Sequence, residues 1–461
     1  MSDLIDRFRT LLGEGAVLTG EAVAPNSMIW GHEQGCEARA LLRPKTPKQV
    51  SEILRLCHEH GQTVVPHGGL TGLVDGAVTH ADDVILSLQR LDQIEDVDPV
   101  NRTMTVQAGV PLERVQQAAE AAGLMFAVDL GARGSATIGG NIATNAGGLR
   151  VIRYGMMREN VLGLEAVLAD GSTVSSMSRY IKNNTGYDLK QLFIGSEGTL
   201  GVVTRAVLRL RQAPVSQCTA LIACPDFDSA AQLLSVLEKG LGGMLSTFEV
   251  MWPEFYALVT TEPARGRPPL AQGHPLYVLT EAQGSDQVSD MAQFETLLME
   301  CSETGMIEDA AVAQSRAERN AFWALREDVE QLWRFAPIVN LDVSLPIGDM
   351  PAYVTSLQSE LRRRWPDHRC FVFGHMGDGN LHVVISTGSP DPAALHAAER
   401  VVYEGLAPFQ GAISAEHGIG IERRDYLSIS RGPAEIALMR TLKQGLDPQN
   451  LLNPGKIISS A

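Results

Sequence analysis

One apolar–turn–apolar stretch restricts the fold of this chain more than any other feature. Residues 371–373 (Phe-Val-Phe) and 383–385 (Val-Val-Ile) are apolar runs typical of buried strands, and residues 377–380 (Gly-Asp-Gly-Asn) between them are turn-forming. The pattern predicts a strand–turn–strand hairpin. Such a hairpin brings His375 and His382 face to face at its mouth, so it restricts the chemistry of the chain as well as its fold.

The two histidines of this hairpin, together with a carboxylate further along the chain, form a candidate ligand set for a metal. Glu416 is the carboxylate, and His417 beside it is a further imidazole. Two imidazoles and one carboxylate (His375, His382 and Glu416) are an ordinary set for a divalent transition metal that keeps positions open for a substrate. Either histidine alone would be interpreted as a polar residue at a strand end, but the whole pattern favours a site. We expect Zn²⁺, and the same ligands also suit Mn²⁺ or Fe²⁺.

The length of the chain predicts more than one domain. A chain of 461 residues exceeds what one hydrophobic core normally supports. Residues 211–214 (Arg-Gln-Ala-Pro) mark the boundary that we favour, because the proline ends the preceding strand. We therefore expect a first domain over residues 1–213, a second over 214–420, and a helical segment over 421–461 that packs back on the first.

The charge and composition exclude several classes of partner. The formal net charge of −16 repels nucleic acid and anionic lipid, and an aromatic content of 5% is low for a surface that stacks on bases. The six cysteines form no Cys-x-x-Cys pair, which is typical of reduced thiols. We find no signal-peptide pattern and no apolar run of about 18 residues, so we expect a cytoplasmic protein without a transmembrane segment.

Strand and helix patterns alternate through both large domains, which predicts an α+β class. In the first domain, residues 63–66 and 84–88 have the pattern of strands, and residues 47–61 that of a helix with Thr46 as its N-cap. In the second domain, the predicted strands lie far apart in sequence. We therefore expect an antiparallel sheet covered by helices on one face.

Three glycine-rich segments fall in the first domain, at residues 66–76, 131–148 and 195–201. Glycine lets the backbone turn tightly, point its N–H groups inward and approach a ligand closely. The first segment lacks both the Gly-x-Gly-x-x-Gly spacing of a Rossmann loop and the Gly-Lys-Ser/Thr of a P-loop. Three such segments in one domain favour a large dinucleotide over a single phosphate.

These segments resemble the flavin-binding domain of the vanillyl-alcohol oxidase superfamily. The His375–His382 hairpin, with residues 414–420 (Ser-Ala-Glu-His-Gly-Ile-Gly), resembles its FAD-dependent D-2-hydroxyacid dehydrogenase family. The resemblance extends from about Pro44 to Lys456. It implies an α+β fold with a two-part FAD-binding domain, a substrate or cap domain that contains an antiparallel sheet and the metal site, and a C-terminal helical segment.

The resemblance also implies which residues hold the FAD. Because His67 precedes the glycine pair instead of following it, we expect the FAD to be bound without a covalent link. The alternative for His67 is a loop residue whose backbone matters more than its ring. The implied FAD-binding residues are Pro66, His67, Gly68, Gly69, Leu70, Thr71, Gly72, Gly76, Gly134, Ser135, Gly139, Gly140, Asn141, Thr144, Asn145, Gly147, Gly148, Glu197, Gly198, Gly201, Val202 and Asn453.

Three further residues receive catalytic roles. A metal would bind the substrate hydroxyl and one carboxylate oxygen together, which leaves His417 as the natural general base; support of a neighbour or simple packing is its alternative. Arg326 matches the position that clamps the substrate carboxylate in the family, and a solvated arginine paired with Glu330 is the alternative. Asn380 would orient the substrate or a metal ligand, or only form the turn.

The implied reaction is oxidation of a D-2-hydroxy acid to the 2-oxo acid, with hydride transfer to flavin N5. By the resemblance, enzymes for 2-hydroxyglutarate carry a lysine where this chain has Asn340, so a distal carboxylate lacks its cation here unless Arg334 supplies it. This departure counts against 2-hydroxyglutarate itself and leaves room for D-lactate, a D-2-hydroxyglutarate-like acid or a more apolar 2-hydroxy acid. Without a cysteine cluster for iron–sulfur, electrons go to an external acceptor such as an electron-transferring flavoprotein, a quinone or a cytochrome.

Other functions stay open at this point. The chain could be the flavin subunit of a multi-subunit glycolate oxidase, or a flavin- or metal-binding protein without catalysis. A zinc hydrolase with the same ligands is disfavoured because it leaves the glycine-rich domain without a purpose. The resemblance also leaves room for a homodimer.

Overall fold

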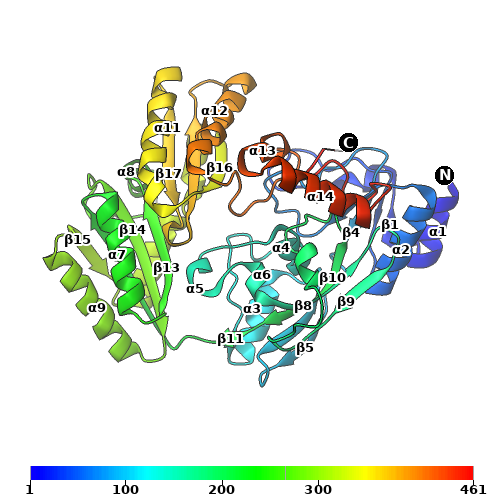
Figure 1. Cartoon of the computed structure of the whole chain (residues 1–461), viewed down its shortest axis with the longest axis horizontal. Helices are drawn as coiled ribbons and strands as arrows, with labels where there is room; N and C mark the ends of the chain where they lie inside the picture. The colour runs from blue at the N-terminus through cyan, green and yellow to red at the C-terminus, as the bar shows by residue number, and fades with distance from the viewer. Residues whose placement is uncertain (1, 265, 460–461) are drawn as a thin grey trace. The chain divides into compact units, whose positions relative to one another are not determined.

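The chain forms two compact units in the computed structural model, which describes residues 2–264 and 266–459 (Figure 1). The first unit contains Met1–Gly148, Gly155–Ala213 and Glu416–Ala461, and the second contains Leu149–Tyr154 and Pro214–Ala415. One division between the units falls between Ala213 and Pro214. Two details differ from the expected limits: the returning segment starts at Glu416, and Leu149–Tyr154 belongs to the second unit.

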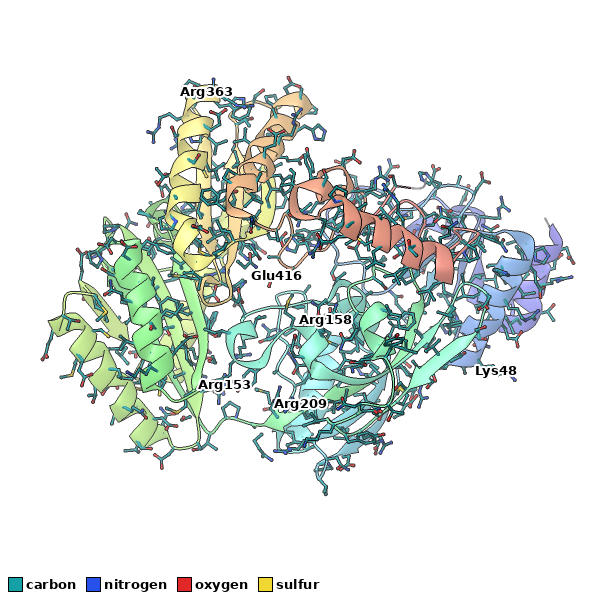
Figure 2. The ribbon with its side chains drawn as sticks, viewed as in Figure 1. Lys48, Arg153, Arg158, Arg209, Arg363 and Glu416 are labelled. Carbon is teal, nitrogen blue, oxygen red and sulfur yellow. The ribbon has the colours of Figure 1, made fainter. Side chains whose placement is uncertain are left out.

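Hydrogen bonds explain why the short Leu149–Tyr154 segment belongs to the second unit. Arg153, labelled in Figure 2, donates to the backbone carbonyls of Met244 and Gln283. The hydroxyl of Thr247 donates to the carbonyl of Leu149 at 2.9 Å. These partners are distant in sequence, so no local pattern reveals the exchange.

The first unit begins with a small sheet and two helices. The sheet order is β1-β2-β4-β3, with β1 antiparallel to β2 and the other pairs parallel. As expected, Thr46 caps the second helix by accepting from the Gln49 N–H. Phe8, Ile53 and Leu54 bury the helices against the sheet. The bounds are α1 Ser2–Leu12, α2 Pro47–His60, β1 Val17–Leu18, β2 Ala40–Leu42, β3 Val64–His67 and β4 Val84–Ser87.

A second, antiparallel sheet of the first unit has the order β5-β6-β10-β8-β9. Beside it, a helix occupies the middle of the second glycine-rich segment, where the sequence analysis expects none. Thr137 caps this helix through the Gly140 N–H, and Ile138 and Ile142, one turn apart, are two of its buried residues. The bounds are β5 Ile94–Asp98, β6 Thr103–Gln107, α3 Leu112–Ala121, β7 Leu124–Met125, α4 Ile138–Thr144, α6 Met157–Asn160, β8 Val161–Val167, β9 Thr173–Ser176, β10 Val202–Arg209 and β11 Arg211–Gln212, with β7 paired to β11.

The returning segment completes the first unit with α13 (Leu427–Ser430) and α14 (Pro433–Leu446). Residues after α14 then pair with β3, since Val64 exchanges backbone hydrogen bonds with Leu451 and Asn453. Lys443 on α14 donates to the carbonyls of Thr199 and Leu452. This segment therefore packs against the first small sheet and the third glycine-rich loop.

The second unit is built on one antiparallel sheet with the order β15-β12-β14-β13-β17-β18-β16. The antiparallel arrangement agrees with expectation. The strand bounds are β12 Ser216–Cys224, β13 Leu245–Met251, β14 Leu276–Gly284, β15 Asp309–Val312, β16 Val339–Ser344, β17 Arg369–Gly374 and β18 Asn380–Ser386.

Helices cover both faces of this sheet, so the expectation of a single covered face is wrong. Figure 1 shows α7 and α9 in front of the sheet. On the other face, Phe255 of α8 and Leu325 of α10 share a hydrophobic cluster with the strand residues Leu279 and Phe373. The helix bounds are α5 Val151–Tyr154, α7 Phe227–Gly240, α8 Pro253–Thr260, α9 Gln287–Glu303, α10 Arg316–Glu327, α11 Met350–Arg364 and α12 Pro392–Glu404. No helix of the described residues has the length and apolar character needed to cross a bilayer.

Candidate active site

The predicted hairpin is present as β17 and β18. Its turn is a short 3₁₀ segment, Met376–Asp378, followed by Gly379, whose φ of +87° is a backbone conformation that favours glycine. His375 follows β17 directly, and His382 lies in β18 opposite Phe373. The Nε2 atoms of the two imidazoles are 3.4 Å apart. The hairpin therefore turns the Nε2 edges of both rings toward each other.

The third predicted ligand, Glu416, joins this group. One ligand atom from each of His375, His382 and Glu416 lies within 4.8 Å of the others. Glu416, labelled in Figure 2, follows Ala415, whose N–H donates to Oδ2 of Asp342 at 2.8 Å. Two imidazole nitrogens and one carboxylate at this spacing fit a divalent transition metal.

A buried carboxylate that the sequence analysis missed lies behind His375. Oε1 of Glu249 on β13 lies 2.6 Å from Nδ1 of His375. Burial alone would raise the pKa of Glu249, but the neighbouring His375 and Arg326 side chains lower the pKa below its ordinary value. The available signal was a glutamate in the middle of the otherwise uncharged strand 245–251.

Arg326 on α10 is the second partner of this carboxylate. Its Nε donates to Oε2 of Glu249 at 2.8 Å, and its Nη2 lies 2.8 Å from the same oxygen. The guanidinium also lies 4.8 Å from the ring centre of Phe373. Arg326 is buried and Glu330 is exposed, so the alternative of a solvated arginine paired with Glu330 is wrong.

His417, next to Glu416, contacts a buried arginine of the first unit. Nη2 of Arg423 lies 3.2 Å from Nδ1 of His417. A guanidinium can only donate, so Nδ1 accepts and a neutral ring carries its proton on Nε2. Nearby, Oε1 of Glu416 accepts a 3.0 Å hydrogen bond from the N–H of Gly148.

The remaining candidates of the second unit lie on β16 and β18. Asn380 begins β18 opposite Ser344, and its Oδ1 is buried without a hydrogen-bond partner among the described residues. Asn340 is exposed on β16, opposite Val384 and two residues before Asp342. Arg334 is exposed. The sheet register thus places Asn340 on the same face as Asp342 and, opposite it, His382.

Several glycines of the glycine-rich segments pack closely against other parts of the protein. A Cβ on Gly68 would lie 2.7 Å from Oγ1 of Thr137, one on Gly69 would overlap the Ser135 carbonyl, and one on Gly148 would overlap the Asp129 carbonyl. The close approach that the sequence predicts is therefore real, but at these glycines the neighbour is another backbone segment.

Three buried polar atoms of the first unit suit a bound cofactor. Nδ1 of His67, Nδ2 of Asn141 and Oδ1 of Asn453 have no hydrogen-bond partner among the described residues. Nε2 of His67 meets the Ala77 carbonyl at 2.8 Å, and burial lowers the pKa of His67 to about 4, so its ring is neutral. Buried polar atoms normally have partners. These three therefore fit a large polar cofactor such as FAD.

All the FAD-binding candidates lie in the first unit. Oε1 and Oε2 of Glu197 accept from the N–H groups of Ile419 and Gly420, so this side chain holds the returning segment. Oδ1 of Asn145 accepts from the Arg158 N–H. Pro66 and His67 end β3, Gly68, Gly69, Leu70, Thr71, Gly72 and Gly76 follow it, Gly134 and Ser135 precede α4, Gly139, Gly140, Asn141 and Thr144 lie in α4, Asn145, Gly147 and Gly148 follow α4, Glu197, Gly198 and Gly201 precede β10, Val202 begins β10, and Asn453 follows α14.

Family models match both parts of the chain. Residues 38–176 match an FAD binding domain, and residues 213–457 match the C-terminal domain of FAD linked oxidases. Together with the fold, the two matches define the class of this protein, an FAD-linked oxidase and hence an FAD-dependent oxidoreductase.

Curated relatives narrow the class to a family. The chain is 43% identical to D-2-hydroxyglutarate dehydrogenase of Xanthomonas citri pv. viticola, over 91% of this chain and 89% of that protein. It is 40% identical to the mitochondrial D-2-hydroxyglutarate dehydrogenase of Bos taurus, over 96% and 81%. It is 36% identical to the enzyme of that name from Stutzerimonas stutzeri, over 99% of each. The chain therefore belongs to the FAD-dependent D-2-hydroxyacid dehydrogenase family.

Solved structures confirm the predicted fold. Alkyldihydroxyacetonephosphate synthase superposes with a TM-score of 0.76 at 14% identity and covers 98% of this chain and 85% of its own. p-Cresol methylhydroxylase superposes with a TM-score of 0.77 at 16% identity and covers 99% and 97%. These structures thus confirm the vanillyl-alcohol oxidase fold.

Proposed function

We propose that this chain oxidises a D-2-hydroxy acid to the 2-oxo acid with FAD and a divalent metal. The observation that carries the proposal is the group of His375, His382 and Glu416 within 4.8 Å of one another. The names of the relatives and the FAD binding domain support the reaction class. When bound, FAD accepts the hydrogen and electron pair from Cα, and the cation polarises the substrate oxygens.

The protein residues hold and orient the two groups and the substrate. His375, His382 and Glu416 hold the cation, and the cofactor residues of the first unit hold FAD without a covalent link. Nε of Arg326 donates to Glu249, and Nη2, which has no hydrogen-bond partner among the described residues, is the nitrogen that we assign to a substrate carboxylate. Oδ1 of Asn380 accepts a hydrogen bond from the substrate.

The role of His417 depends on its proton. With Arg423 donating to Nδ1, a neutral His417 presents Nε2–H and donates to a substrate oxygen. To take the hydroxyl proton as the general base, the ring must move its proton to Nδ1 and lose the Arg423 contact. The observed contact supports a donor role in binding the substrate. The oxidation itself also needs a base for the hydroxyl proton, so the general-base role of His417 stays a prediction.

We infer that the substrate is D-lactate or a D-2-hydroxyglutarate-like acid. Asn340, on the same sheet face as Asp342 and His382, offers a neutral amide to the distal end of the substrate. Exposed Arg334 offers the cation that a second carboxylate needs. The acceptor is external: an electron-transferring flavoprotein, a quinone or a cytochrome.

A dye-reduction assay tests the proposal. The purified FAD-bound protein is given D- and L-2-hydroxy acids with an artificial acceptor, before chelation, after chelation and after return of Zn²⁺, Mn²⁺ or Fe²⁺. We expect turnover of a D-acid that chelation removes and a metal restores. The His382→Ala variant should bind less than about one-tenth of the metal that the wild type binds. The His396→Ala variant, changed at a largely exposed position, should bind as much metal as the wild type. Turnover that persists without metal contradicts the metal role, and no turnover of any D-acid contradicts the reaction.

A further inference from the structure

A chain of three buried side chains connects helix α10 to the candidate metal ligand His375. Glu249 is 1% exposed and stands between the other two. Its Oε1 lies 2.6 Å from Nδ1 of His375, and its Oε2 lies 2.8 Å from both Nε and Nη2 of Arg326. All three residues belong to the second unit.

We propose that Glu249 is a positioning residue that holds His375 as the Nδ1–H tautomer and turns its Nε2 lone pair toward the cation. Arg326 in turn fixes the orientation of the Glu249 carboxylate. The inference rests on the metal site of the proposed function. It adds Glu249 and Arg326, which do not belong to the candidate metal-ligand set.

The tautomer follows from what each atom can do. An ionised carboxylate only accepts hydrogen bonds, so Nδ1 of His375 must donate to Glu249 and carries the proton of a neutral ring. Nε2 then has the lone pair that a metal requires. It already lies 3.4 Å from Nε2 of His382. A metal-binding histidine commonly donates its other ring N–H to a carboxylate in this way.

Arg326 makes this carboxylate different from an isolated buried charge. Two guanidinium nitrogens at one oxygen leave the other oxygen for His375, so the carboxylate cannot rotate without losing a charge-assisted contact. An unpaired carboxylate at this depth would be strongly destabilising. The orientation of His375 is therefore set by a residue of α10.

A second buried glutamate provides a matched control. Glu281 on β14 is 2% exposed and lies on the same sheet face as Glu249, because Thr247 is its cross-strand partner. It accepts from Nε1 of Trp323, one turn before Arg326 on the same helix. Both glutamates thus attach α10 to the sheet, but only Glu249 contacts a candidate ligand.

Metal affinity is the first measurement. The FAD-bound protein is stripped of metal, and Zn²⁺ is titrated in competition with a chromophoric chelator. We expect Glu249→Gln to weaken Zn²⁺ binding by about 10- to 100-fold and Glu281→Gln to change it by less than about threefold. Equal affinity of Glu249→Gln and wild type overturns the inference while leaving the metal site intact.

The second measurement determines the tautomer of His375. It requires no metal, and it does not depend on whether a Glu249 variant folds. The ¹⁵N shifts of the wild-type histidines are recorded without metal. The His375 signal is identified because it is missing from the spectrum of the His375→Gln variant. We expect the proton on Nδ1; a proton on Nε2 overturns the inference. If the wild type binds no Zn²⁺, the metal part of the proposed function fails, and the same spectrum still decides whether Glu249 fixes the ring.

Discussion

The backbone N–H of Gly148 donates a 3.0 Å hydrogen bond to Oε1 of Glu416, which joins the end of a glycine-rich segment to a candidate metal ligand. Gly148 has a φ of +122°, and a side chain there would overlap the Asp129 carbonyl. The glycine is therefore required by the path of the backbone, and that path presents the N–H to the carboxylate. One segment thus serves both the proposed FAD site and the proposed metal site.

The first prediction concerns Gly148→Ala. The added Cβ must displace the segment, which we expect to destabilise the first unit by about 2 kcal/mol or more and to weaken Zn²⁺ binding by about tenfold. FAD retention after gel filtration and chelator competition measure the two effects. Gly131→Ala is the control, because a Cβ at Gly131 meets nothing within 4 Å. Equal metal affinity in both variants would contradict the role of the Gly148–Glu416 contact.

The second prediction is a pH dependence set by His67. Burial lowers its pKa in the folded protein to about 4, below the ordinary value of 6.5. The unfolded chain therefore takes up the proton first as pH falls. The neutral ring costs nothing above about pH 6.5, and between pH 6.5 and 4 the folded state loses about 3 kcal/mol relative to the unfolded state.

His67→Gln removes this titration and keeps a side-chain N–H for the Ala77 carbonyl. Urea unfolding of the FAD-bound protein at several pH values, followed by flavin fluorescence, gives the difference between variant and wild type. We expect that difference to shift in favour of the variant as pH falls from 6.5 to 4. Parallel pH curves would show that the ring is not held neutral.

The third prediction concerns the returning segment. Lys443 pairs at 2.5 Å with Asp447, a carboxylate that is 1% exposed and also accepts from the N–H groups of Leu451 and Leu452. Lys443→Met leaves that carboxylate without its cation, so we expect a loss of about 3–5 kcal/mol in the free energy of unfolding. Arg431→Met, which breaks an exposed pair, should cost less than about 1 kcal/mol. A small effect at Lys443 would mean that the amides alone hold the carboxylate.

The fourth prediction separates the two roles of His417. A glutamine can donate to a substrate oxygen but cannot act as a base, so the donor role predicts that His417→Gln keeps at least about tenfold more turnover than His417→Ala. Both variants should retain FAD. If glutamine and alanine lower kcat equally, by about 10²- to 10⁴-fold, the general-base role is supported instead.

Local sequence patterns predict the hairpin well and place its two candidate ligands. Alternation of apolar residues and turn chemistry is short-range information, and His375 and His382 lie on either side of one turn. The same is true of the helix capped by Thr46. The division at Pro214 also has a local cause, since proline cannot continue the ladder of a strand.

Local sequence patterns do not predict contacts between residues that are far apart in the sequence. Glu249 and Arg326 meet across 77 residues, and only the fold brings them together. Helix α4 is not predicted, because glycines are unfavourable in a helix interior. The Thr137 cap and the buried pair Ile138 and Ile142 were available signals. The glycine count indicates close approach but not whether the neighbour is a cofactor or protein, as Gly69 illustrates.

The pairing of β3 with residues 451–453 has a consequence for biosynthesis. The ribosome adds these residues only after it has made Pro214–Ala415, the main part of the second unit. Val64, their partner, is made much earlier, and its N–H and C=O groups lack these protein partners until then. During translation, the nascent first unit is therefore an incomplete body that closes only after its neighbour has emerged.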